Sequence, residues 1–103
     1  MEAYKTYSLY LWLNDKETKK QKIWTLDAFK IVRNLVIAEF WGWTITEAEG
    51  VYSHENWEIV EEKTIKIELI TEKPIEKFIN TLKTTFNQES ILVKSAIENI
   101  AFI

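Results

Sequence analysis

The chain has 103 residues, of which 47% are hydrophobic and 14% aromatic, and 13 basic and 16 acidic residues give a formal net charge of −3. We therefore expect residues 1–103 to form one globular domain without a nucleic-acid partner, since no positive field is available to gather phosphates. The lack of cysteine excludes disulfides and sulfur-ligated zinc and suits a cytoplasmic protein, and no segment has the roughly 18 apolar residues of a membrane span.

Alternation of side chains predicts a first strand over residues 7–13. One face of it is apolar and carries Tyr7, Leu9, Leu11 and Leu13. The other face carries Ser8, Tyr10 and Trp12. Because two aromatic residues occupy this second face, we do not expect it to be fully exposed to water. Residues 14–22 are polar and charged, and we expect them to form a solvated loop.

A first helix is predicted from Thr25, whose hydroxyl can cap it, with Asp27 in the first turn where a negative charge is favourable. Apolar residues recur at helical spacing and predict its buried stripe: Leu26, Phe29, Val32, Val36 and Phe40. Gly42 stands where a left-handed residue commonly ends a helix.

Two further strands are predicted over residues 43–52 and 59–70, and a hairpin is the shortest way to connect them. The segment GVYSHENW, residues 50–57, lies at its tip and is interpreted as a turn with SHEN as the loop. Gly50 indicates a bulge or a close approach to the backbone. Tyr52 and Trp57 are expected to meet across the hairpin.

Pro74 is well placed in the first turn of a second helix, whose stripe is Ile75, Ile79, Leu82 and Phe86 with Phe78 beside it. A last strand is built on Ile91, Val93 and Ile97. The order strand, helix, strand, strand, helix, strand predicts an α+β, ferredoxin-like βαββαβ fold, in which both helices cover one face of an antiparallel sheet.

Tyr10 and Trp12 then point to the sheet face that the helices do not cover. Such a face either packs against a second subunit or receives a ligand. Burial of each aromatic side chain would contribute about 2 to 3 kcal/mol. A homodimer, or a higher oligomer, is the favoured interpretation, with a small-molecule ligand as the alternative.

The remaining candidate site residues are Glu47, Glu49 and His54. Burial of either glutamate would raise its pKa and suit it to proton transfer, but the favoured interpretation is that both reach water. His54 is interpreted as a turn residue, because a single histidine without cysteine cannot make an ordinary zinc site. The sequence predicts neither a metal site nor a cofactor.

Three segments resemble a bacterial family of small uncharacterised domains: GWTITEAEGVY, EEKTIKIEL and FNQESILV. The matching positions are Gly42, Thr44, Ala48, Gly50, Thr64, Phe86, Gln88, Glu89, Ser90 and Leu92. Tyr52 departs from the family, which has Trp at that position. The resemblance implies a ferredoxin-like fold without a settled activity. It draws attention to residues 88–90, which either end the second helix or form a polar cluster at one end of the sheet.

Two functional hypotheses remain open at this stage. The favoured one is a non-enzymatic module for assembly or small-ligand binding. The alternative is a cofactor-independent enzyme of the dimeric ferredoxin-like kind, which transfers a proton on an apolar or aromatic small molecule. The enzyme hypothesis requires a pocket in which Glu47, Glu49 or His54 lies beside Tyr or Trp side chains.

Overall fold

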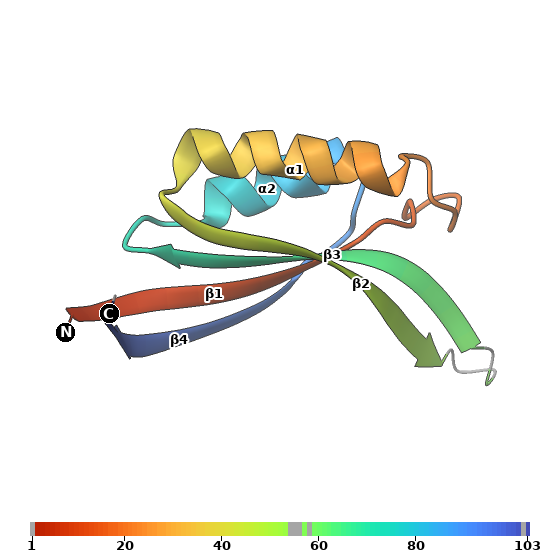
Figure 1. The fold of residues 1–103 in the computed structure, drawn as a ribbon. Helices are drawn as coiled ribbons and strands as arrows, with labels where there is room; N and C mark the ends of the chain where they lie inside the picture. Colours follow the sequence, from red (N-terminus) through yellow and green to blue (C-terminus); the bar gives the residue numbers. More distant parts are fainter. Residues whose placement is uncertain (1, 54–56, 58, 102) are drawn as a thin grey trace.

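The six predicted elements follow one another along the chain in the computed structural model, which describes residues 2–53, 57, 59–101 and 103. They are β1 (Glu2–Trp12), α1 (Thr25–Glu39), β2 (Gly42–Ser53), β3 (Ile59–Thr71), α2 (Glu76–Thr85) and β4 (Leu92–Ile100). The strands form one antiparallel sheet in the order β2-β3-β1-β4, and both helices lie on the same face of it (Figure 1). The predicted ferredoxin-like α+β fold is confirmed.

The hydrophobic core lies between the helices and the two central strands. Leu9 and Leu11 of β1 are fully buried, as are Ile65 and Ile67 of β3, and each of the two leucines is directly opposite one of the isoleucines. Burial of an aliphatic side chain of this size contributes about 1.5 to 3 kcal/mol. The alternation seen in the sequence therefore identifies the helix-covered face of both strands.

The start of α1 differs from the prediction. Thr25 is the first helical residue and no side chain caps the helix. Its hydroxyl instead accepts a hydrogen bond of 2.9 Å from Gln21 Nε2, which connects the helix to the preceding loop. The buried stripe contains Ala28, Val32 and Val36, whereas Leu26 is 61% exposed. Leu26 points away from the sheet because it lies half a turn from Ala28.

The end of α1 also differs from the prediction, because Gly42 does not adopt a left-handed conformation and is already the first residue of β2. The chain leaves the helix at Phe40, which is extended and donates its backbone N–H to Val36 O at 2.8 Å. The Phe40 ring is buried and packs edge-on against Phe78 of α2, with ring centroids 5.1 Å apart. Burial of an aromatic side chain therefore fixes the end of this helix.

The second helix buries Phe78 and Leu82, with Ile75 and Phe86 packed at its two ends. It begins at Glu76, two residues after Pro74. Neither described helix, of 15 and 10 residues, is long and apolar enough to cross a membrane.

The sheet extends beyond the helices at both ends (Figure 1). At one end β2 and β3 continue as a two-stranded ribbon, which confirms the predicted hairpin. The register pairs Tyr52 with Val60, so Trp57, which has a φ of 66°, is not its partner across the strands as the sequence had suggested. The loop between the strands contains His54, which lies outside the described residues.

We predict that truncation of Leu82 to alanine lowers the free energy of unfolding by about 2 to 5 kcal/mol, because the side chain is fully buried beneath α2. Leu26→Ala makes the same chemical change at an exposed position of α1 and should alter it by less than about 0.5 kcal/mol. Urea unfolding followed by circular dichroism measures both. Equal losses would contradict the described packing of the helices.

Candidate functional site

The open face of the sheet carries Tyr10 and Trp12, as alternation along β1 predicts. Tyr10 is half-buried and has one lysine on each side, one from each neighbouring strand. Lys66 Nζ lies 5.7 Å and Lys94 Nζ 5.3 Å from the centre of its ring. Both distances are within the range of a cation–π contact. The surroundings of Tyr10 are therefore positively charged rather than apolar.

The indole of Trp12 reaches across the sheet toward the β2 edge. Trp12 is opposite Thr64 of β3, and a Cβ atom added to Gly50 of β2 would lie 3.4 Å from its Nε1 and 3.1 Å from Thr64 Oγ1. Both contacts are at or near the limit of close packing, so any side chain at Gly50 would crowd this corner. The predicted close approach at Gly50 is confirmed, and the group that approaches is an aromatic ring of the candidate site.

Glu62 provides a carboxylate on the same face of the sheet as this ring. It lies on β3 opposite Gly50, two residues before Thr64, and therefore shares the open face with Trp12. Glu62 is only 9% exposed, and its Oε2 accepts a hydrogen bond of 3.4 Å from the backbone N–H of Asn14. Glu62 was not among the candidate site residues predicted from the sequence.

A second feature of the open face is a hollow of about 350 Å³ at the end opposite to Trp12. Its lining includes hydroxyl and carboxylate groups from all four strands: Thr6, Ser8, Thr44, Glu68 and Glu98. Glu68 also forms an ion pair of 3.5 Å with Lys66. Every second side chain of β1 lies on this face, so a row of side chains runs from Trp12 to Thr6 at the polar hollow, over roughly 20 Å.

Glu47 and Glu49 do not join this face. They lie on β2 with the residues that face the helices, and both are exposed. Glu49 forms an ion pair of 3.2 Å with Lys63. The structure therefore brings together Tyr10 and Trp12 but separates them from these two carboxylates. Within the described part of the chain, no three His, Cys, Asp or Glu side chains gather as a metal ion would require.

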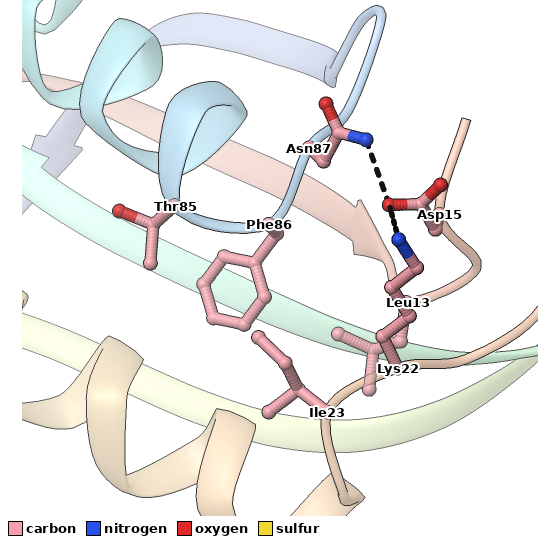
Figure 2. A pocket seen from close by; sticks show the side chains of 7 residues that line it. All are labelled: Leu13, Asp15, Lys22, Ile23, Thr85, Phe86 and Asn87. Atoms are coloured by element: carbon pink, nitrogen blue, oxygen red, sulfur yellow. Dashed lines mark hydrogen bonds and ion pairs between the residues drawn. The ribbon is translucent and has the colours of Figure 1, made fainter. Parts of the chain in front are cut away.

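A different polar cluster surrounds Asp15, in the loop that was predicted to be solvated. Asp15 is buried, and its Oδ2 accepts hydrogen bonds from the backbone N–H groups of Glu17, at 2.9 Å, and Thr18, at 3.0 Å. Its Oδ1 accepts one of 2.7 Å from Asn87 Nδ2 and lies 3.5 Å from Lys22 Nζ (Figure 2). The hydrogen bond from Asn87, reinforced by those of the loop, holds the pKa of Asp15 well below its usual value of 3.8.

The Asp15 cluster borders a pocket of about 230 Å³ between the loop and the end of α2. Asn87 has a left-handed φ of 48° directly after the C-cap Phe86, a position that asparagine tolerates. Gln88 Nε2 donates to Asn14 O at 2.7 Å and to Phe86 O at 3.3 Å, while Glu89 and Ser90 are exposed. Gln88 therefore satisfies one carbonyl at the end of α2, in agreement with one of the two roles considered for it, and one carbonyl of the loop after β1. The cluster holds the loop against α2.

No family model and no curated protein sequence matches the chain, so the resemblance to a bacterial family of small domains remains a prediction. Similar solved structures exist for a phage SAM lyase. The structure in complex with S-methyl-5′-thioadenosine has a TM-score of 0.61 and 19% identity, and the alignment covers 90% of this chain and 80% of that one. The apo structure has a TM-score of 0.63 and 20% identity, with 94% and 86% covered. The likeness establishes a shared fold over nearly the whole chain.

We predict that Asp15→Asn lowers the melting temperature near neutral pH. Because the folded pKa lies below the unfolded value, the ionised carboxylate stabilises the fold above pH 3.8, and this contribution is lost as the pH falls toward the folded pKa. The difference between wild type and variant should therefore shrink below about pH 4. Asp27→Asn, at an exposed acid of α1, is the matched control. A difference that does not change with pH would contradict a stabilising role of the charge.

Proposed function

We propose that this protein binds S-adenosylmethionine (SAM) on the open face of its sheet and cleaves it to S-methyl-5′-thioadenosine without a cofactor. The observation that carries the proposal is the fold shared with a phage SAM lyase, of which one structure holds S-methyl-5′-thioadenosine. This function shares with the alternative left open by the sequence an enzyme that needs no cofactor. It differs in the substrate, which is a charged nucleoside rather than an apolar or aromatic small molecule, and in the reaction, which is not a proton transfer.

The groups of the open face suit the parts of such a ligand. The half-buried indole of Trp12 is a stacking surface for adenine, and stacking of a base on an aromatic ring contributes about 1 to 3 kcal/mol. Lys66 and Lys94, which flank Tyr10, attract the carboxylate of the methionine part. The hydroxyl and carboxylate groups of the neighbouring hollow are available to its ammonium group.

Glu62 is the carboxylate that fits the positive sulfur of SAM, because it lies on the same face as Trp12 and is nearly buried. Attraction between opposite charges is stronger in such a partly desolvated position than in bulk water. Glu62 therefore favours the cationic SAM over the neutral thioether product. This preference also assists release of S-methyl-5′-thioadenosine after the reaction.

The proposed reaction needs no oxidant and no metal. The bond between sulfur and the γ-carbon of the methionine chain breaks, and its electron pair stays on sulfur, which becomes a neutral thioether. The γ-carbon bonds to an oxygen of the substrate's own carboxylate, which closes a lactone and requires no separate proton acceptor. Because the positive charge disappears during the step, a desolvated site favours it, whereas the attraction of Glu62 contributes to the binding of SAM and not to the step itself.

A ligand-binding module without catalysis is the second candidate. It is favoured by the position of Glu47 and Glu49, the two carboxylates that the sequence considered for proton transfer, because both lie on the other side of the sheet. The enzyme and the binding module would bind the same ligand on the same surface, so they differ only in whether SAM is cleaved.

We predict that the wild-type protein converts SAM to S-methyl-5′-thioadenosine in the presence of a metal chelator, as measured by chromatography of the nucleosides. Glu62→Gln should weaken binding of SAM by about tenfold or more in calorimetry, while binding of S-methyl-5′-thioadenosine changes little, because only SAM is charged. Glu47→Gln, on the opposite side of the sheet, is the matched control and should alter neither affinity.

If the protein bound SAM but formed no S-methyl-5′-thioadenosine, the result would support the ligand-binding module instead of the enzyme. If the protein bound neither SAM nor S-methyl-5′-thioadenosine, both candidate functions would be contradicted. Equal losses for the charged and the neutral nucleoside in Glu62→Gln would show that this glutamate acts on the shape of the site rather than through its charge.

A further inference from the structure

Thr64 is buried although it lies on the side of the sheet that the helices leave open. It is only 3% exposed, whereas Lys66 and Glu68, the next residues of β3 on the same face, are half-buried and exposed respectively. Trp12 is directly opposite Thr64 across the pair of β1 and β3, and its indole is the large side chain at this corner. The indole therefore covers Thr64.

The indole lies along the sheet rather than upright on it. Neighbouring strands are about 4.8 Å apart, and β3 lies between β1 and β2, so Trp12 and Gly50 belong to strands about 10 Å apart. A Cβ atom added to Gly50 would nevertheless be 3.4 Å from the indole Nε1 and 3.5 Å from Cδ1. An indole that stood upright on β1 could not reach so far. One face of the ring is therefore turned to the sheet and the other to solvent, in agreement with the half-buried state of Trp12.

Gly50 permits this placement through its lack of a side chain. Its backbone is not in the left-handed region, so other residues could adopt the same conformation. A Cβ atom here would come within 3.1 Å of Thr64 Oγ1, which is shorter than an ordinary contact, and would also press on the indole. Thr64 is β-branched and buried, so it has little freedom to turn away. Because the indole has solvent on one side, it is the group that a side chain would displace.

We propose that Gly50 positions Trp12 for the nucleoside, since the missing side chain lets the indole lie flat on Thr64 and present one whole face to the base. This inference rests on the proposed function, which supplies the ligand. A stacking surface has to be held at the productive angle, and an indole lifted at its Nε1 edge loses contact with part of the base. Gly50 acts through Trp12 and is a positioning residue.

Gly42 provides a matched control on the same strand and the same face. It lies eight residues before Gly50 on β2, and because this number is even, a side chain at either position would point to the open face. A Cβ atom at Gly42 would be 3.3 Å from Ile70 Cβ, and the nearest atoms around it all belong to Ile70. Gly42→Ala and Gly50→Ala are therefore the same chemical change with similar crowding, but only the second displaces the indole.

The test compares binding of S-methyl-5′-thioadenosine to the two alanine variants by calorimetry. This nucleoside is neutral, so the result does not depend on the charge of Glu62, which is opposite Gly50. Gly50→Ala should weaken binding by about tenfold, because stacking of a base contributes at least this much, whereas Gly42→Ala should bind as the wild type does. In the protein without ligand, the nuclear magnetic resonance signal of the Trp12 indole N–H should move in Gly50→Ala and stay in place in Gly42→Ala. Circular dichroism confirms that both variants are folded.

A double-mutant cycle separates positioning from a general effect on the sheet. Trp12→Phe keeps an aromatic ring that is too short to reach Gly50, so Gly50→Ala should not weaken binding further in that background. An equal loss in both backgrounds, a Gly50→Ala protein that binds as the wild type does, or an equal loss in Gly42→Ala would each overturn the proposal and leave the proposed function standing. A wild type that binds no nucleoside would instead contradict the proposed function, and the role of Gly50 with it.

Discussion

The burial of one face of the two central strands is the constraint on which the rest of the structure depends. Leu9 and Leu11 of β1 and their partners Ile67 and Ile65 of β3 exclude water completely beneath the helices. Side chains alternate along a strand, so this burial also fixes Tyr10 and Trp12 on the opposite face. A slip of one residue would expose the core and bury Lys66, and the register is therefore strongly determined.

The two sides of the sheet consequently differ in chemistry. The helix-covered side holds the hydrophobic core. The open side combines an aromatic corner at Trp12, cations around Tyr10, the nearly buried carboxylate of Glu62 and a polar hollow. The first pattern stabilises the fold, and the second suits a small ligand with both charges and an aromatic base.

The fold was predictable because periodicity marks each element, and the strand alternation that identified Leu9 and Leu11 also located Tyr10 and Trp12. Local signals at the ends of α1 were misleading, since Thr25 and Gly42 match capping preferences while burial of Phe40 decides where the helix ends. The burial of Asp15 was missed because its partner Asn87 is 72 residues away. Likewise, the contact between Trp12 and Gly50 joins strands that are not adjacent in the sheet, and no local pattern reveals it.

The central claim is that the open face binds a SAM-type nucleoside at Trp12. The most direct measurement is a nuclear magnetic resonance titration of the five indole N–H signals with S-methyl-5′-thioadenosine, each signal assigned by substitution of one tryptophan. The claim predicts that the Trp12 signal shifts in a saturable way, while that of Trp24, on the helix side of the molecule, stays in place. A Trp12 signal unchanged at saturating nucleoside, or a shift of the Trp24 signal alone, would contradict it.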